Sequence, residues 1–305
     1  MSIPAPAPPT GKLKIFALGA RPRTLPAAIV PVLVGTAVAW WWLGDHHLQW
    51  WRGVGALAVA LAVQIGTNYA NDYSDGIRGT DKARVGPVRL VASELASPKA
   101  VAFAALASFA VAAAVGIVLA AFTSWWVVAV GAACFCAGWL YTGGPKPYGY
   151  MGLGELFVFV FFGLVATCGS AYVEGVRLAS SGFHAAIVAS VATGMLSVAL
   201  LEANNLRDIK GDTVAKKRTL AVRLGRRNAG YLYVATLVAS VAAAVVVAAI
   251  WRPGALLIFV AAPLAYRPSG LALGESEGRD LLPMLAGTAR LQLYAGLLLA
   301  IGILL

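Results

Sequence analysis

Long apolar segments separated by short polar ones dominate this chain. Nine of them approach the roughly 20 apolar residues that a helix needs to cross a bilayer. They span residues 24–43, 53–73, 99–121, 124–142, 150–173, 185–205, 229–250, 254–271 and 284–304. The apolar runs lack the strict alternation of membrane β-strands. The pattern therefore predicts an all-α, polytopic membrane bundle of about nine transmembrane helices.

Composition agrees with a membrane protein. Hydrophobic residues make up 60% of the chain and charged residues only 12%, and the mean hydropathy is +0.77, outside the usual range of soluble domains. Cys134, Cys136 and Cys168 all fall within apolar segments, so neither a disulfide framework nor a zinc site is indicated. The Pro-rich residues 1–20 are predicted to form a disordered cytoplasmic tail. Residues 21–305 are predicted to form one transmembrane domain.

Basic residues are distributed unevenly between the predicted loops. If the N-terminus is cytoplasmic, Arg52, Arg177 and Arg252 fall on the opposite side and Arg290 lies inside the last segment. The other 20 of the 24 Lys and Arg residues are then cytoplasmic, which follows the positive-inside rule and requires an odd number of crossings. The net charge of +11 is mostly a consequence of this topology. Nucleic-acid binding is therefore a poor interpretation, and the predicted location is the cell membrane.

Two similar polar motifs lie at corresponding ends of the second and sixth predicted helices. NDYSD occupies residues 71–75, and NNLRD occupies residues 204–208. Each motif is followed by a further acid, Asp81 or Asp212, and then by a basic loop. The matching positions predict two four-helix pseudo-repeats plus a ninth helix.

Helical spacing places the oxygen-bearing side chains of each motif on a common face. Asn71 and Asp75 are four residues apart, as are Asp208 and Asp212. Oxygen ligands without nearby His or Cys favour Mg²⁺ over zinc, and Mg²⁺ commonly shares its coordination shell with substrate phosphates. Neighbouring Lys and Arg side chains would bind the remaining phosphate oxygens. The two clusters therefore predict a site for Mg²⁺ (for which Mn²⁺ would substitute) and a phosphorylated substrate.

Two other interpretations account for part of this pattern. Helix capping or solvation at the membrane surface would explain an isolated acid such as Asp81, but two matching clusters need a common cause. A cation-coupled transporter would also carry acids on repeated helices. Transporter sites, however, usually lie near the bilayer midplane, and the accompanying Lys and Arg suit a polyanion better than a metal ion in transit.

Several stretches of the sequence resemble the intramembrane aromatic prenyltransferases of the UbiA superfamily. They are ARPRTLPAAIVPVLVGT, NDYSDGIRGTD, GPVRLV, YTGGPKPYGYMGLGE and NNLRDIKGDTVAKKRTLAVRLG, and together they cover nearly the whole chain after the first twenty residues. The Asp-rich motifs are typical of the superfamily, and the others resemble its branch acting on 1,4-dihydroxy-2-naphthoate. The six-residue separation of Asp75 and Asp81 is shared with that branch. Lys216 and Glu94 depart from it, because glycine is expected at both loop positions.

The resemblance implies a function and a site. A polyprenyl diphosphate would bind through Mg²⁺ in a central cavity open sideways to membrane lipid. Its prenyl group would pass to 1,4-dihydroxy-2-naphthoate, with loss of diphosphate and CO₂, to give demethylmenaquinone or its quinol. Another acceptor, such as 4-hydroxybenzoate or homogentisate, is the alternative. By matched position, the implied metal ligands are Asn71, Asp72, Asp75, Asp81, Asp208 and Asp212, and the implied diphosphate-binding residues are Lys146 and Arg207.

Other polar and aromatic side chains near the cytoplasmic face are candidates for substrate binding. The candidates are Asn68, Tyr73, Arg78, Tyr141, Tyr148, Tyr150, Asn204 and Lys217. Tyrosine faces would stabilise an allylic cation, although a membrane-interface aromatic belt explains any one of them at least as well.

Three charged residues in or next to apolar segments need separate explanations. Arg21 and Arg23 would hold the acceptor carboxylate at the cytoplasmic mouth, although positive-inside anchoring is the stronger explanation. Glu155, in the fifth apolar segment, is costly in a membrane. Either a polar contact inside the cavity or a shallow interfacial position would account for it.

Overall fold

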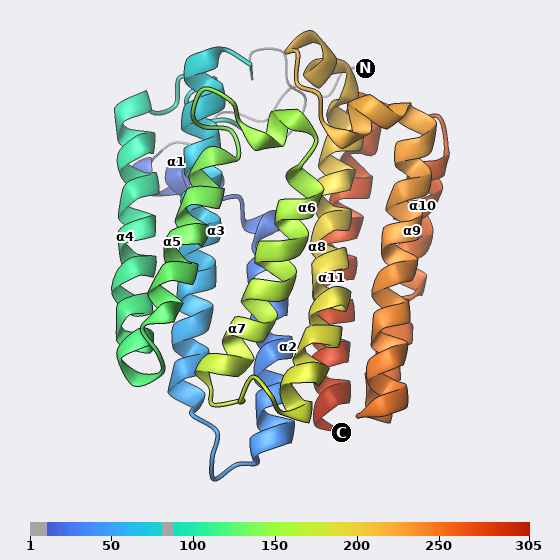
Figure 1. Cartoon of the computed structure of the whole chain (residues 1–305). Helices are drawn as coiled ribbons and strands as arrows, with labels where there is room; N and C mark the ends of the chain where they lie inside the picture. The colour runs from blue at the N-terminus through green and yellow to red at the C-terminus, as the bar shows by residue number, and fades with distance from the viewer. Residues whose placement is uncertain (1–10, 81–87) are drawn as a thin grey trace.

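The computed structural model describes residues 11–80 and 88–305, and these residues form a helical bundle without a strand among them (Figure 1). Eight helices in the described ranges have the length and composition to cross a membrane, and a shorter apolar helix, Trp126–Leu140, adds a ninth. The predicted all-α bundle of about nine crossings is therefore confirmed. The protein is an integral, multi-pass membrane protein.

The crossings follow one another along the chain. The first four are α2 (Pro26–Leu43), α3 (Trp50–Arg78), α4 (Pro98–Phe122) and α5 (Trp126–Leu140). The fifth is α6 (Gly154–Val158), the π-helical η3 (Phe159–Val165) and α7 (Ala166–Val173), and the sixth and seventh are α8 (Ser181–Val214) and α9 (Leu220–Ile250). The last two are η4 (Pro253–Ala261) with α10 (Pro263–Leu273), and η5 (Gly278–Leu281) with α11 (Leu282–Leu304). Short helices α1 (Lys12–Gly19), η1 (Pro22–Thr24) and η2 (Tyr148–Met151) lie outside these crossings.

Helix α1 occupies part of the predicted tail. Its Phe16 packs edge-on against Tyr69 of α3, with ring centroids 6.0 Å apart, and the Tyr69 hydroxyl donates a 2.7 Å hydrogen bond to the Phe16 carbonyl. These contacts hold α1 against the bundle. The prediction of disorder is therefore wrong for Lys12–Gly19, while residues 1–10 lie outside the described residues.

Small residues allow the helices to approach one another closely. A Cβ atom added to Gly163 of η3 would lie only 2.7 Å from the Cα atom of Gly194 on α8, so the two backbones are in contact there. Close backbone approach of this kind drives helix association in lipid, where the hydrophobic effect between helices is absent. The contact fixes η3 against α8 and so determines where α6 presents its side chains.

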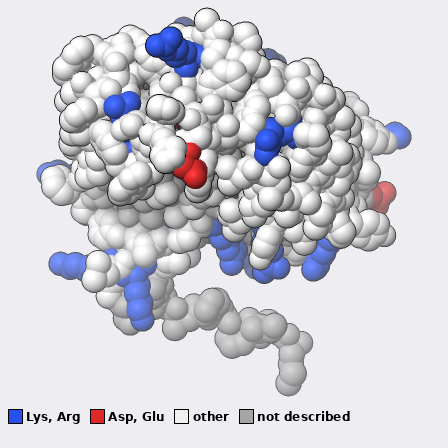
Figure 2. All heavy atoms as spheres, turned by 90° about the horizontal axis from the view of Figure 1, so that it is seen from below, with Lys and Arg blue, Asp and Glu red and all other residues white. Residues whose placement is uncertain are grey.

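The two polar motifs lie at the same end of the bundle. Helices α3 and α8, the second and sixth crossings, both end at the top of Figure 1, whereas the chain's C-terminus lies at the bottom. Figure 2 shows that opposite end, where charged side chains are scattered among uncharged ones. The placement agrees with the predicted parallel pseudo-repeats.

A cavity of about 940 Å³ runs through the interior. Apolar residues of α2 to α5 line one side, and residues of α6, η3, α7 and α8 line the other. Most of its polar lining residues gather near the ends of α3 and α8, as the positions of Asn71, Asp75 and Asp212 illustrate. The predicted central cavity is therefore confirmed, with a polar end and a long apolar body.

Candidate active site

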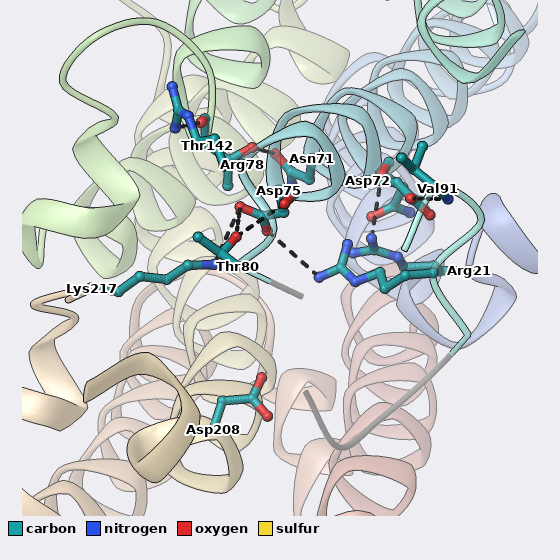
Figure 3. A network of polar contacts seen from close by, with 12 residues as sticks. Arg21, Asn71, Asp72, Asp75, Arg78, Thr80, Val91, Thr142, Asp208 and Lys217 are labelled. Carbon is teal, nitrogen blue, oxygen red and sulfur yellow. Dashed lines mark hydrogen bonds and ion pairs between the residues drawn. The ribbon is translucent and has the colours of Figure 1, made fainter. Parts of the chain in front are cut away.

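Asp75 is the best-connected acid at the polar end of the cavity. It is only 2% exposed, and its Oδ1 atom accepts hydrogen bonds from the Tyr150 hydroxyl (2.5 Å), Lys217 Nζ (3.3 Å) and the Thr80 hydroxyl (3.3 Å). Arg89 Nη2 lies 4.0 Å from its Oδ2 atom. Side chains from separate parts of the chain therefore converge on this carboxylate (Figure 3), and two of them are cations.

Tyr150 serves as a neutral donor in this cluster. It belongs to η2, outside the membrane-spanning segments, and burial together with the negative charge of Asp75 raises the pKa of Tyr150 above its ordinary value. The phenol therefore keeps its proton at physiological pH. The Lys217 ammonium group lies 4.6 Å from the centroid of the same ring, within the range of a cation–π interaction. Tyr150 thus holds both the acid and the lysine.

The end of α3 is fastened to the loop that follows α5. The Thr142 hydroxyl donates a 2.8 Å hydrogen bond to Asn71 Oδ1, and both residues line the cavity. Arg78 donates to the carbonyls of Thr142 and Gly144. Arg78, which was expected to bind substrate, is therefore engaged by backbone oxygens and is not among the cavity-lining residues.

The second motif is organised differently. Arg207 Nε and Nη2 donate bidentate 2.7 Å hydrogen bonds to the two carboxylate oxygens of its neighbour Asp208. The Arg207 side chain is fully buried, and its Nη1 atom has no hydrogen-bond partner within the part of the chain that the structure describes. Arg207 and Asp212 line the cavity, whereas Asp208 is not among the lining residues, and Figure 3 shows Asp208 apart from the network around Asp75. The structure thus brings the two predicted clusters together.

The second residues of the two motifs, Asp72 and Asn205, lie in different surroundings. Asp72 is fully buried, and its two carboxylate oxygens accept backbone hydrogen bonds from Leu90 (2.8 Å) and Val91 (3.1 Å). It is not among the residues that line the cavity. Its counterpart Asn205 does line the cavity and donates a hydrogen bond to Glu155. In this structure Asp72 therefore holds the segment after α3 instead of facing the metal position that the resemblance implied.

Further predicted residues line the cavity wall nearest the start of α2. Asn68 Nδ2 and Gln64 Nε2 each donate a 3.0 Å hydrogen bond to the Thr24 hydroxyl. Arg21 Nη2 lies 3.4 Å from the Asn68 carbonyl oxygen. Arg21, Arg23 and Asn68 all line the cavity, so the structure assembles a basic and amide-rich wall there. Gln64 was not among the predicted site residues, although a polar side chain within an apolar stretch of α3 was a signal for it.

Aromatic residues form another part of the lining. Tyr148 donates a 2.8 Å hydrogen bond to a backbone carbonyl of α5, and its ring stacks on Phe157 at 3.9 Å. Tyr141 meets Tyr148 edge-on at 5.5 Å. All three rings line the cavity, as does Asn204, whose amide bonds to a backbone carbonyl of α8. These aromatic faces are placed to stabilise positive charge inside the cavity.

Two further candidates, Lys146 and Tyr73, are not brought to the cavity. Lys146 is exposed, and Tyr73 packs against Trp139 of α5. Neither is among the cavity-lining residues. Asp81 lies outside the described residues. Conversely, Arg89 and Tyr150 contact Asp75 directly, although the sequence analysis had not singled out Arg89 and had treated Tyr150 only as an aromatic face.

The donor set fits Mg²⁺ that shares its coordination with a substrate. The available donors are all oxygen atoms, from Asn71, Asp75, Asp208 and Asp212. Within the described ranges, no group of three or more His, Cys, Asp or Glu residues is arranged to hold a metal. The protein therefore offers incomplete sets of ligands from two helices beside several cations. That combination suits a metal ion arriving with a polyanion.

Comparison with known proteins places most of the chain in one family. Residues 28–280 match the UbiA prenyltransferase family. A 1,4-dihydroxy-2-naphthoate octaprenyltransferase from Mycobacterium tuberculosis is 52% identical over 283 residues, which are 92% of this chain and 94% of the relative.

Solved structures share the fold at low sequence identity. A UbiA homologue from Aeropyrum pernix superimposes with a TM-score of 0.69 at 15% identity, covering 92% of this chain and 96% of that one. A UbiA homologue from Archaeoglobus fulgidus, bound to GPP and Mg²⁺, gives a TM-score of 0.63 at 14% identity, covering 93% and 99%. With its bundle of membrane-spanning helices and residues of both Asp-rich motifs at one cavity, this chain belongs to the UbiA prenyltransferase family.

Proposed function

We propose that this protein transfers a polyprenyl group from a polyprenyl diphosphate to 1,4-dihydroxy-2-naphthoate, with loss of diphosphate and CO₂, as a step of menaquinone biosynthesis. One observation carries the proposal: Asp75 of the first Asp-rich cluster and Arg207 and Asp212 of the second line one long, mostly apolar cavity. A diphosphate between the clusters would place its tail in the apolar body. The acceptor named for the Mycobacterium tuberculosis relative supports the choice of naphthoate.

The diphosphate would bind the cationic side chains that now neutralise the acids. Lys217, now bonded to Asp75, and Arg207, now bonded to Asp208, would turn toward phosphate oxygens in charge-assisted hydrogen bonds. The unpartnered Nη1 atom of Arg207 is a further donor for this purpose. Mg²⁺ held by the released carboxylates, with Asn71 and Asp212, would neutralise charge on the departing diphosphate.

The remaining steps depend on shielding the allylic cation from water more than on acid–base catalysis. Tyr141 and Tyr148 would stabilise the allylic cation through their ring faces, and the apolar walls would exclude water. The electron-rich ring then forms the new carbon–carbon bond. Departure of the carboxyl group as CO₂ returns its bonding electron pair to the ring. No net proton transfer is required, so a dedicated base is unnecessary.

Purified protein with Mg²⁺ and a prenyl diphosphate should be offered 1,4-dihydroxy-2-naphthoate, 4-hydroxybenzoate and homogentisate in parallel. We expect diphosphate and CO₂ to appear in equal amounts with the naphthoate, and the prenylated product to be identified by mass. Activity should disappear with EDTA and return with Mg²⁺ or Mn²⁺. Turnover of 4-hydroxybenzoate or homogentisate alone would contradict the acceptor, and cation-driven flux without product would favour a transporter.

We also propose that the site faces the cytoplasm in the cell membrane, because the loops at that end carry most of the basic residues. Reporter fusions at Lys216, after α8, and at His47, between α2 and α3, should report opposite sides, with Lys216 cytoplasmic. The reverse result would contradict the orientation.

A further inference from the structure

Glu155 is a buried carboxyl group that the proposed reaction does not use. It lies in the first turn of α6, inside a membrane-spanning segment, and is 8% exposed. Its Oε1 atom accepts a 2.9 Å hydrogen bond from Asn205 Nδ2. Its Oε2 atom has no hydrogen-bond partner among the described residues. A carboxyl group is expensive at this depth, so its contact with Asn205 calls for a functional explanation.

Asn205 lies at the level where the reaction would occur. It lines the cavity and is 9% exposed. On α8 it precedes Asp208 by three residues, which places it about 4.5 Å further into the membrane. In the proposed reaction the diphosphate lies beside Asp208, and the allylic carbon is attached to it on the cavity side. The acceptor ring must approach that carbon, and therefore comes near Asn205.

The contact with Glu155 determines which end of the Asn205 amide is left for a ligand. An asparagine side chain has a donor end, Nδ2, and an acceptor end, Oδ1. Glu155 accepts the hydrogen bond from Nδ2. The carbonyl oxygen, on the other arm of the amide, is thus left for a donor in the cavity. An acceptor hydroxyl group is such a donor.

We propose that Glu155 is a positioning residue that holds Asn205 with its carbonyl oxygen toward the acceptor, where it accepts a hydrogen bond from a naphthoate hydroxyl group. The inference rests on the proposed function and extends it to acceptor selection. A site built to bond a substrate hydroxyl strongly disfavours an analogue without it, because the buried partner is left unpaired. Glu155 and Asn205 would therefore favour dihydroxy over monohydroxy acceptors.

Glu202 offers a matched control. It is a second buried carboxyl group, 5% exposed, on α8 three residues before Asn205. Its Oε1 atom accepts a 3.0 Å hydrogen bond from Thr236, and its Oε2 atom has no partner in the described part of the chain. Neither Glu202 nor Thr236 is among the cavity-lining residues. Replacing Glu202 removes a similar buried carboxyl without releasing a residue that faces substrate.

The test compares Glu155→Leu, Glu155→Gln, Asn205→Ala and Glu202→Leu in the full-length protein. KM is measured separately for 1,4-dihydroxy-2-naphthoate and for the polyprenyl diphosphate. Glu155→Leu and Asn205→Ala should raise KM for the naphthoate about ten- to hundredfold, the loss expected for a buried hydrogen bond, and leave KM for the diphosphate unchanged. Glu155→Gln keeps an acceptor oxygen and should stay within a few-fold of wild type. Glu202→Leu should change neither KM.

Ligand binding without turnover completes the test. Thermal stabilisation of each variant by 1,4-dihydroxy-2-naphthoate and by 1-hydroxy- or 4-hydroxy-2-naphthoate reports affinity directly. Wild type should prefer the dihydroxy compound, and Glu155→Leu should lose the preference over at least one monohydroxy analogue.

Three results would overturn the inference. The first is an unchanged naphthoate KM in Glu155→Leu, and the second is an equal rise of KM for the naphthoate and the diphosphate. The third is a kcat in Glu155→Gln as low as in Glu155→Leu, which would indicate that Glu155 transfers a proton. A wild type that binds the naphthoate selectively but never prenylates it would refute the proposed function alone.

Discussion

The two Asp-rich motifs are neutralised in different ways. Asp75, at the end of α3, is bonded by Tyr150 and Lys217, which lie 75 and 142 positions further along the chain. Asp208, at the end of α8, is bonded in bidentate fashion by the adjacent Arg207. The first motif therefore joins separate parts of the chain, whereas the acid of the second is paired with the arginine beside it in the same helix. Similar motifs can thus supply similar ligands while contributing differently to the architecture.

The second position of each motif repeats this contrast. Asp72 holds backbone amides of Leu90 and Val91, and Asn205 holds the side chain of Glu155 at the cavity wall. One residue therefore secures the chain that follows α3, while the other lines the cavity. The pseudo-repeat fixes where these side chains lie but not what they contact.

The largest expected effect follows from removing either central acid. Asp75→Asn and Asp208→Asn should each lower kcat by roughly two to three orders of magnitude, as found when one group that stabilises transition-state charge is lost. The temperature of thermal unfolding should fall in Asp75→Asn, because this substitution weakens hydrogen bonds to Tyr150 and Lys217 from distant parts of the chain. Near-wild-type turnover of either variant would contradict the shared site.

Combining the two substitutions tests whether the motifs act as one unit. If both hold a single diphosphate, the double variant Asp75→Asn/Asp208→Asn should be scarcely slower than the slower single variant, because groups that act together are strongly non-additive. The quantity to compare is kcat for all four proteins under saturating substrate. Losses that multiply would show that the two clusters serve separate steps.

Lys217→Met should have effects of opposite sign on two ligands. Lys217 now lies 3.3 Å from Asp75 and competes with any metal there, so the variant should bind Mn²⁺ several-fold more tightly when diphosphate is absent. Inorganic diphosphate with Mg²⁺ should bind about tenfold more weakly, since a charged hydrogen bond is lost. Electron paramagnetic resonance of Mn²⁺ and thermal stabilisation by diphosphate measure the two effects.

Lys146→Met is the matched control, because Lys146 is exposed and away from the cavity. It should change neither affinity. If Lys217→Met changed the affinities for Mn²⁺ and for diphosphate in the same direction, the proposed double role of Lys217 would be contradicted.

Sequence periodicity predicted the bundle well because membrane crossings are dictated by local composition. The apolar lengths, the placement of basic residues and the four-residue spacing of Asn71 and Asp75 are properties of short stretches. They were sufficient to place both motifs at the same end of the bundle. They also indicated a site in which oxygen ligands bind a metal ion and basic side chains bind a phosphate.

Spacing could not predict the contacts made across the bundle. Lys146 and Lys217 are both basic loop residues in the sequence, but only Lys217 is buried against Asp75. The difference arises where the chain turns after α8: Lys216 adopts a positive φ of 57°, and the Lys217 amide bonds to the Asp212 carbonyl at 2.8 Å. A turn of this kind directs a side chain in a way that no periodicity records. For the same reason, the sequence did not predict that Asn205 donates a hydrogen bond to Glu155.

The smallest effect on catalysis is expected at Asp72. Asp72→Ala leaves the amides of Leu90 and Val91 without their acceptor, at a cost of about 1–3 kcal/mol for the buried Leu90 amide and less for the half-buried Val91 amide. The unfolding temperature should fall clearly, while kcat per folded molecule stays within a few-fold of wild type, because Asp72 does not line the cavity.

Asn205→Ala, at the equivalent position, should behave in the reverse way, with a small change in stability and a raised naphthoate KM. Measuring unfolding, kcat and Mg²⁺ dependence for both variants separates the two roles. If Asp72→Ala instead required far more Mg²⁺ for half-maximal rate, its carboxylate would be a metal ligand after all. The first motif would then have to release the Leu90–Val91 segment each time substrate binds, and loop and metal would be coupled through a single side chain.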